Sequence, residues 1–161
     1  KEYRRQRQMC IRDRLNIVSL HKGVVLKYCL FCKAQEIEYK KEVVYENDFF
    51  YATRDSYPVT KLHTLVIPKR HFQSYFDMNN DEIKSINIVL NEQRKEIVKL
   101  DSSVTAFNIG INDGKDAGQS IYHLHVHLIP RRQGDVENPR GGVRGVIPAK
   151  QKYVKKESLE K

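Results

Sequence analysis

A chain of 161 residues, 40% of them hydrophobic, has the size and composition of one globular domain with a single core. Its formal net charge is +9, and residues 1–14 carry +4 of it through six Lys/Arg against two Asp/Glu. The sequence contains no run of 18 apolar residues and no signal-like stretch, which excludes a membrane-spanning helix and makes the cytoplasm the expected compartment.

The basic segment 1–14 shows no clear apolar period. We therefore expect it to be a disordered or non-native leader, and we favour a solvated tail over an arm that binds nucleic acid. The domain itself is expected over residues 15–150, followed by a flexible C-terminal tail over residues 151–161.

Three short apolar runs predict the first strands. The runs at 43–45 and 49–52 flank Glu46-Asn47-Asp48, which predicts a β-hairpin. Residues 64–67 form a third run that Pro68 ends, as expected for a buried strand.

A helix and two more strands are predicted in the second half of the chain. Apolar residues recur at a helical period over 81–100, and Asn79 or Asn80 can cap the start of this amphipathic helix. Strands are expected at 104–111 and 121–129, separated by a glycine-bearing loop. Consecutive strands with one long helix predict an α+β domain built on an antiparallel sheet.

Three of the six histidines lie at alternate positions of the last predicted strand: His123, His125 and His127. Alternate side chains of a strand share one face, so each imidazole is expected within about 7 Å of the next one along the strand. An ordinary structural role does not explain such a cluster well. Two functional interpretations remain, a metal site or nucleophilic and acid–base chemistry on phosphate.

The motif His-φ-His-φ-His-φ-φ, with φ apolar, resembles the signature of the histidine-triad (HIT) superfamily. Further stretches that carry the resemblance are Cys29-Leu30-Phe31-Cys32, residues 62–71 and residues 112–120. It covers residues 29 to 132, and Pro130 to Asp135 is similar to the Fhit-like and diadenosine-polyphosphate-hydrolase-like branch. The resemblance implies an antiparallel sheet of about five strands, one long helix, a short N-terminal zinc knuckle and a homodimer.

The resemblance also implies a nucleotide hydrolase or transferase with His125 as the nucleophile. His125 would attack the α-phosphate of a diadenosine polyphosphate or related nucleotide and form a nucleotidyl-histidine intermediate. His127 and Ser120 would stabilise charge on the phosphate or the leaving group. The alternatives are an adenosine phosphoramidase and a nucleotide-binding sensor with little turnover.

The expected nucleotide contacts come from two loops and the triad. Asp55 would bind the ribose hydroxyls, and a helix or turn cap is the alternative interpretation of this residue. Phosphate contacts are expected from the loop before the triad, and an ordinary turn is the alternative there. His63 is expected to support the triad strand. The expected nucleotide-binding set is Asp55, Asn112, Gly118, Gln119, Ser120 and His127.

Cys29 and Cys32 have the spacing of two ligands on a zinc knuckle. The resemblance supplies the other two ligands, His71 and His123, which gives a closed Cys2His2 set and hence a structural site. Two buried thiols are the alternative, whereas a thioredoxin-like redox pair lacks the matching βαβ context.

Four arginines follow the triad. The simpler interpretation is a solvated basic surface, and the alternative is that one or two of these arginines line a phosphate site. They are Arg131, Arg132, Arg140 and Arg144. Outside the leader the charge is only +5 over 147 residues, so we do not expect nucleic-acid binding. The expected partners are a nucleotide and a second copy of the chain, and no membrane.

Overall fold

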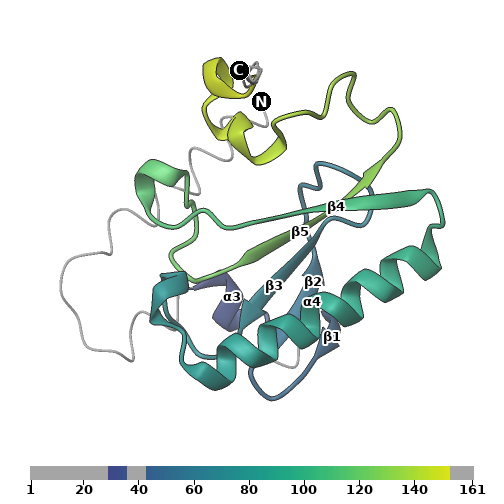
Figure 1. The fold of residues 1–161 in the computed structure, drawn as a ribbon. Helices are drawn as coiled ribbons and strands as arrows, with labels where there is room; N and C mark the ends of the chain where they lie inside the picture. Colours follow the sequence, from purple (N-terminus) through teal and green to yellow (C-terminus); the bar gives the residue numbers. More distant parts are fainter. Residues whose placement is uncertain (1–28, 36–42, 153–161) are drawn as a thin grey trace, which may run out of the picture.

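The computed structural model describes residues 29–35 and 43–152 (Figure 1). The predicted leader, and nearly all of the predicted tail, lie outside these residues. Within the described ranges, no helix combines the length and the hydropathy that a bilayer span requires.

Five antiparallel strands form one sheet, in the order β1-β2-β3-β5-β4. The strands are β1 Val43–Glu46, β2 Phe50–Arg54, β3 Thr64–Pro68, β4 Val104–Gly110 and β5 Val126–Arg132. The helices are α3 Leu30–Lys33 and α4 Asn80–Leu100, and four 3-10 turns are η2 Tyr75–Asp77, η3 Lys115–Ala117, η4 Gly142–Val146 and η5 Pro148–Lys150. The predicted α+β class, with about five strands and one long helix, is confirmed.

The β1–β2 hairpin turns at Asn47. Its side-chain oxygen accepts hydrogen bonds from the backbone N–H groups of Phe49 (3.0 Å) and Phe50 (2.8 Å), which mimics a backbone turn. Its amide nitrogen donates to the Ser85 hydroxyl on α4 at 2.9 Å. The predicted hairpin is therefore present, and the same residue fixes it to the long helix.

The long helix α4 starts with a capping box. Asn79 accepts from the N–H groups of Asp81 and Glu82, and the Glu82 carboxylate accepts from Asn79 N–H. Asn79 is thus one of the two caps that the sequence predicted. The helix lies along one face of the sheet in Figure 1, with Val89 and Ile86 in the core between them.

The last strand differs from its prediction. Residues 121–129 were expected as a strand ended by Pro130, but β5 begins at Val126 and runs through Pro130. Its pairing with β3 covers only residues 126–128, so the missing N–H of Pro130 removes no ladder bond on that side. Before Val126 the backbone is held outside the sheet, since Leu124 N–H donates to Phe72 O at 2.7 Å.

Because successive side chains of a strand point to opposite sides, the sheet has two faces with different neighbours. Leu124, Val126 and residues of β2 and β3 pack with α4 on one face. On the other face Tyr51, Leu65 and Ile67 pack with Phe31 of α3. The triad histidines alternate with Leu124 and Val126, so they lie on the face opposite α4, next to α3. The candidate site lies on this face.

Candidate active site

Four side chains gather where α3 meets the start of the triad. The Cys32 sulfur lies 3.3 Å from His71 Nδ1 and 3.6 Å from His123 Nδ1, and the Cys29 sulfur lies 3.4 Å from His123 Nδ1. The four potential ligand atoms lie within 4.8 Å of one another. Tetrahedral zinc with Zn–S of about 2.3 Å and Zn–N of about 2.1 Å places sulfur and nitrogen about 3.5 Å apart. The predicted Cys2His2 cluster is confirmed, and its spacing fits zinc.

A backbone carbonyl behind the cluster fixes the orientation of His123. Its Nε2 donates to Pro68 O at 2.9 Å, so Nδ1 is left as the unprotonated nitrogen that faces the sulfurs. Burial, and then the neighbouring Cys29, raise the pKa of Cys32 to about 12. Thiolates therefore form here together with cation binding, as expected of a structural metal site.

His125 lies two residues further on, with 6% of its surface exposed. Its Nδ1 donates to His123 O at 2.9 Å, which leaves Nε2 with a free lone pair. Burial lowers the pKa of His125 and favours this neutral form. The Phe31 ring contacts it edge-on at 5.2 Å between centroids, so the zinc knuckle packs directly against this imidazole.

His127 ends a chain of three polar side chains. Asp55 Oδ2 lies 3.2 Å from His63 Nδ1, and His63 Nε2 lies 3.0 Å from His127 Nδ1. Because a carboxylate only accepts, we assign the His63 proton to Nδ1, so that Nε2 accepts from His127 Nδ1–H; Val59 N–H also approaches His63 Nδ1, at 3.4 Å. His127 Nε2 is then unprotonated, and among the described residues it is a buried side-chain atom without a hydrogen-bond partner. His63 uses both ring nitrogens in this chain, which favours proton sharing over metal binding.

Burial keeps these histidines neutral. It is the largest cause that lowers the pKa of His127, to about 4, and the neighbouring His125 and His63 lower it further. Burial likewise lowers the pKa of His63, although Asp55 acts in the opposite direction. The site therefore presents two bare Nε2 atoms, those of His125 and His127, on one face of the sheet, with the rings 5.2 Å apart.

Comparison with known families agrees with this geometry, because the HIT domain matches residues 36–134, more than half of the chain. The chain belongs to the histidine-triad (HIT) family. An uncharacterized HIT-like protein of Methanocaldococcus jannaschii is 38% identical over 109 residues, which are 68% of this chain and 83% of that relative.

Solved HIT structures share the fold. A zinc-bound histidine triad family protein from Mycobacterium smegmatis aligns with a TM-score of 0.61 and 32% identity over 70% of this chain and 81% of that chain. A Plasmodium falciparum diadenosine triphosphate hydrolase, solved in complex with Cyclomarin A, aligns with a TM-score of 0.57 and 32% identity over 62% and 67%. The first of these agrees with zinc as the metal for the Cys2His2 cluster.

The loop 112–120, here called the phosphate loop after the role proposed for it below, leads into the HIT triad. Gly114 and Gly118 have φ of 89° and 90°, a region that favours glycine, and an added Cβ would meet nothing within 4 Å at either. Backbone conformation, and not crowding, therefore requires both glycines. The Asn112 and Ser120 side chains form no hydrogen bond with described residues, whereas the Gln119 side chain bonds within the protein.

Two of the four arginines after the HIT triad are bonded to acidic side chains. Arg131 pairs with Asp135 at 2.8 Å and also contacts Asn108. Arg132 pairs with Asp101 at 2.8 Å. These two side chains stabilise the end of β5, which does not support the alternative that they line a phosphate site.

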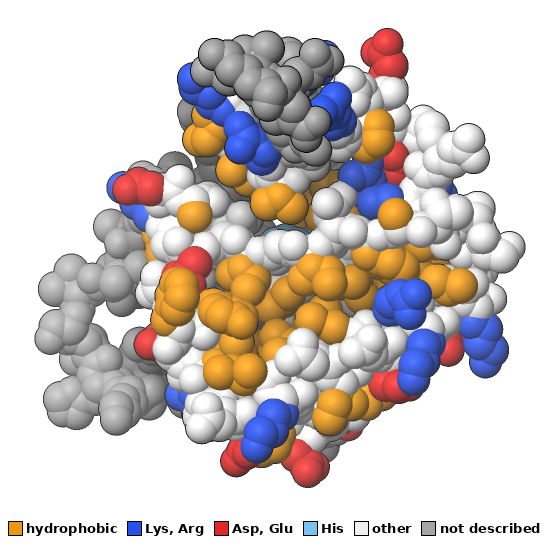
Figure 2. Space-filling view, in the orientation of Figure 1, with side chains coloured by type: hydrophobic (Ala, Val, Ile, Leu, Met, Phe, Trp, Pro, Cys, Tyr) orange, Lys and Arg blue, Asp and Glu red, His pale blue; other side chains and the backbone are white. Residues whose placement is uncertain are grey.

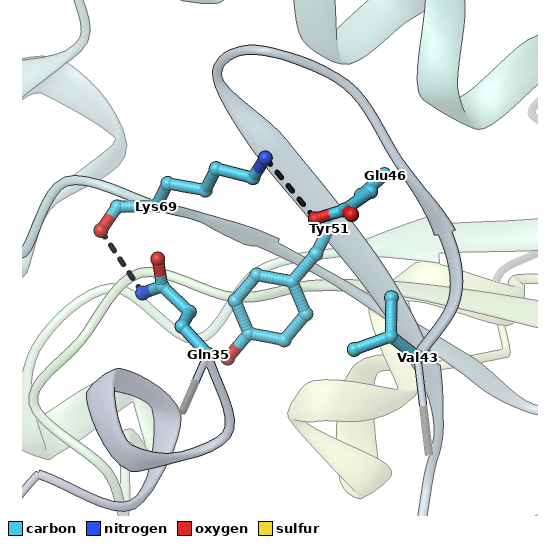
Figure 3. A pocket seen from close by; sticks show the side chains of 5 residues that line it. All are labelled: Gln35, Val43, Glu46, Tyr51 and Lys69. Carbon is cyan, nitrogen blue, oxygen red and sulfur yellow. Dashed lines mark hydrogen bonds and ion pairs between the residues drawn. The ribbon is translucent and has the colours of Figure 1, made fainter. Parts of the chain in front are cut away.

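A small pocket is lined by five residues that do not belong to the triad (Figure 3). Its lining residues are Gln35, Val43, Glu46, Tyr51 and Lys69, none of them a histidine. The Lys69 ammonium pairs with Glu46 at 3.2 Å, and Gln35 donates to Lys69 O at 3.0 Å. Through Lys69 these bonds connect Gln35, which follows α3, with the β1–β2 hairpin. The pocket therefore lies where these two parts of the structure meet, next to the zinc knuckle.

Sequence reasoning named most of the residues that meet here and missed three. Phe31 contacts His125, and Ser74 and Asp113 fasten the phosphate loop. Phe31 lies between the two cysteines of Cys-x-x-Cys, which is a signal that could have found it. Ser74 and Asp113 are separated by 39 residues, and no local pattern links them.

Proposed function

We propose that this HIT protein cleaves nucleotides at the α-phosphate through a covalent nucleotidyl-His125 intermediate. The observation that carries the proposal is the bond from His125 Nδ1 to His123 O, because it leaves Nε2 as an unprotonated nucleophile held rigidly beside the start of β5. An imidazole fixed in this way can attack in line with a leaving phosphate, which is the geometry such a displacement needs.

The chemistry proceeds in two displacements. His125 Nε2 forms a P–N bond while the P–O bond to the leaving phosphate breaks, and the leaving group departs as an anion. Water then attacks phosphorus, the P–N bond breaks, and the water proton passes to a base. His127 Nε2 is suited to receive that proton, because the His63 chain leaves it unprotonated.

The phosphate would lie between the triad and the phosphate loop. The Ser120 hydroxyl and the Asn112 amide are the donors that we assign to its oxygens, because the backbone N–H groups of residues 117–119 already donate within the loop. Gln119 supports the shape of the loop instead, since both its side chain and its backbone N–H are bonded internally. Asp55 remains the proposed ribose contact, while one of its oxygens already accepts from Tyr57 N–H at 2.8 Å.

The proposed substrate class is the diadenosine polyphosphates. The name of the Plasmodium falciparum relative, a diadenosine triphosphate hydrolase, supports it, as does the Fhit-like segment after the triad. Adenosine phosphoramidates are the alternative, because the same nucleophile attacks the same α-phosphate and only the leaving group differs. A sensor with little turnover would bind nucleotide but form no adduct.

A His125→Asn variant tests the proposal directly. We expect it to bind AMP within a few-fold of the wild type but to lose about 10⁴-fold or more in turnover, because no other group supplies the P–N bond. Single-turnover reaction with diadenosine triphosphate labelled at the α-phosphates should leave an acid-labile label on the wild type and none on this variant.

His127→Asn is the matched control, because it also removes one buried imidazole but keeps the nucleophile. It should still form the labelled adduct and should release it slowly. Turnover by His125→Asn near the wild-type rate would refute the nucleophile, and an unlabelled wild type that binds AMP would indicate a sensor.

We also propose that two copies associate through β4. This strand lies at the edge of the sheet, its sequence VTAFNIG carries no charge, and Ile109 on it is 51% exposed. Ile109 pairs in register with Leu128 and therefore projects on the α4 face, where Figure 2 shows a continuous apolar band. Ile83 of α4 is also exposed, at 39%. An uncharged edge strand beside an apolar band suits a second copy.

A further inference from the structure

Asp113 ties the phosphate loop to a distant segment that precedes α4. Its Oδ2 accepts from the Ser74 hydroxyl at 2.9 Å and from Tyr75 N–H at 2.8 Å. A charged acceptor makes both bonds stronger than bonds between neutral groups. Because 38 or 39 residues separate the partners, these bonds fix the position of the loop in the fold and not only its internal turn.

Gln119 makes a second attachment at the other end of the loop. Its side chain is buried, at 4% exposure, and its oxygen accepts from Gly114 N–H at 2.9 Å. Its amide nitrogen donates to Gln73 O at 3.0 Å, one residue before Ser74. Both attachments therefore end on the same segment, residues 73–75.

The segment 73–75 is itself continuous with the rest of the site. It follows the zinc-cluster residue His71, and Phe72 O accepts from Leu124 N–H, midway between His123 and His125. Its position is thus fixed by the zinc cluster and by the backbone of the triad. The hydrogen bonds of Asp113 and Gln119 with this segment therefore fix the position of the phosphate loop relative to His125.

We propose that Asp113 is a positioning residue that holds the phosphate loop at the correct distance from His125, with Gln119 as the second fastening point. Asp113 does not touch the nucleotide; it acts through Ser74 and Tyr75. The inference rests on the proposed function only in assigning phosphate to this loop.

Because Asp113 is negatively charged, the proposal can be tested by whether nucleotide binding becomes tighter or weaker when the charge is removed. A carboxylate beside a polyphosphate repels it, so a purely electrostatic role would predict tighter nucleotide binding when the charge is removed. A positioning role predicts the opposite. Asp116 lies in the same loop, is exposed, and forms no hydrogen bond with described residues, so it offers a matched carboxylate without the attachment.

The experiment compares Asp113→Asn with Asp116→Asn in the full-length, zinc-loaded protein. We expect Asp113→Asn to lower kcat/KM for diadenosine triphosphate about tenfold, mainly in kcat, because small misplacements of catalytic groups are costly. Asp116→Asn should leave kcat unchanged or bind the substrate slightly more tightly. Ser74→Ala, which removes one partner without changing the loop, should lower kcat in the same direction as Asp113→Asn.

Hydrogen exchange of a peptide covering residues 112–120 is the readout that does not depend on catalysis. It should speed up about tenfold in Asp113→Asn and in Ser74→Ala but not in Asp116→Asn, while zinc content and Tm stay near wild type. If the wild type turns over no nucleotide, the proposed function fails and exchange alone decides the positioning role. Equal hydrogen exchange and equal kcat in Asp113→Asn and Asp116→Asn would overturn the positioning role. If Asp113→Asn does not fold, the exchange and kcat of Ser74→Ala decide the question.

Discussion

At the residue scale, the position of one proton on each histidine determines what the site can do. His123 and His125 donate to the backbone carbonyls of Pro68 and His123, and His127 donates to His63. Each ring thereby exposes a chosen nitrogen, one to the sulfurs and two to the proposed phosphate site. Three identical side chains in alternation thus take three different roles because their hydrogen-bond partners differ.

Asp55 has two assigned roles, and a substitution separates them. If it mainly holds the His63 tautomer, Asp55→Asn should lower kcat about a hundredfold with little change in KM, because an amide can donate to His63 Nδ1 and reverse the chain. If it mainly binds ribose, KM should rise instead. Steady-state kinetics with diadenosine triphosphate measures both constants.

His63→Gln is the companion variant for this test, because it breaks the chain without touching the proposed ribose contact. Its kcat should fall to a level similar to that of Asp55→Asn. A normal kcat in both variants would show that the chain has no part in catalysis.

At the element scale, α4 is anchored by Glu82 at its first turn. The Glu82 carboxylate, nearly buried, accepts from Arg70 at 2.9 and 2.8 Å and from Asn79 N–H at 2.9 Å. The Arg70 guanidinium also lies 4.2 Å above the Phe72 ring. These contacts join the helix start to the segment that carries the zinc-cluster residue His71, and the Arg70 bond is the main reason that the pKa of Glu82 is lowered.

This pKa shift predicts an acid-sensitive contribution to stability. A carboxylate with a lowered folded pKa stabilises the fold fully above its unfolded pKa of about 4.3, and the contribution is lost as the pH falls through the folded pKa. Glu82→Gln should therefore reduce the free energy of unfolding by about 1–2 kcal/mol at pH 7. The difference from wild type should shrink at pH 3, as measured by urea unfolding.

Glu92→Gln serves as the control on the same helix. Glu92 pairs with Lys95 at 2.7 Å, but both side chains are exposed. Its substitution should cost less than about 0.5 kcal/mol at either pH. A loss for Glu82→Gln that stays constant from pH 7 to pH 3 would contradict the assigned ionisation.

At the scale of the whole molecule, the triad and the exposed apolar band lie on different faces of the sheet. The triad lies on the face opposite α4, whereas the apolar band lies over β4 and α4 (Figure 2). A second copy could thus cover β4 without covering α3 or the zinc cluster. The proposed dimer would leave nucleotide access to each triad.

Ile109→Asp tests the dimer. A charge in the middle of the edge strand should convert a dimer to a monomer at micromolar concentration, measured by sedimentation equilibrium, because burying an unpaired carboxylate is costly. Ile88→Asp is the matched control: Ile88 is 55% exposed but lies about 140° round α4 from Ile83, and it should leave the dimer intact. A monomeric wild type, or a dimeric Ile109→Asp, would contradict the proposal.

The sequence by itself determined the fold class, the hairpin, the long helix with its Asn79 cap, and the members of the Cys2His2 cluster. The hairpin, the helix and the cysteine pair follow from local periodicity, turn residues and ligand spacing, which act over a few residues, whereas His71 and His123 were expected from the resemblance to the HIT family. The start of β5 could not be read in this way, because pairing with β3, and not the alternation of residues 121–129, decides where the strand begins.

Only the tertiary structure decided which partner each polar side chain meets. The chain from Asp55 through His63 to His127 joins the loop between β2 and β3 to β5, and the Asp113 attachment joins segments 39 residues apart. Gln119 was expected from its sequence position to bind nucleotide, but its side chain accepts a hydrogen bond from Gly114 N–H and donates one to Gln73 O. Hydrogen bonds have short range and strict geometry, so they depend on the packed fold and leave no pattern in the sequence.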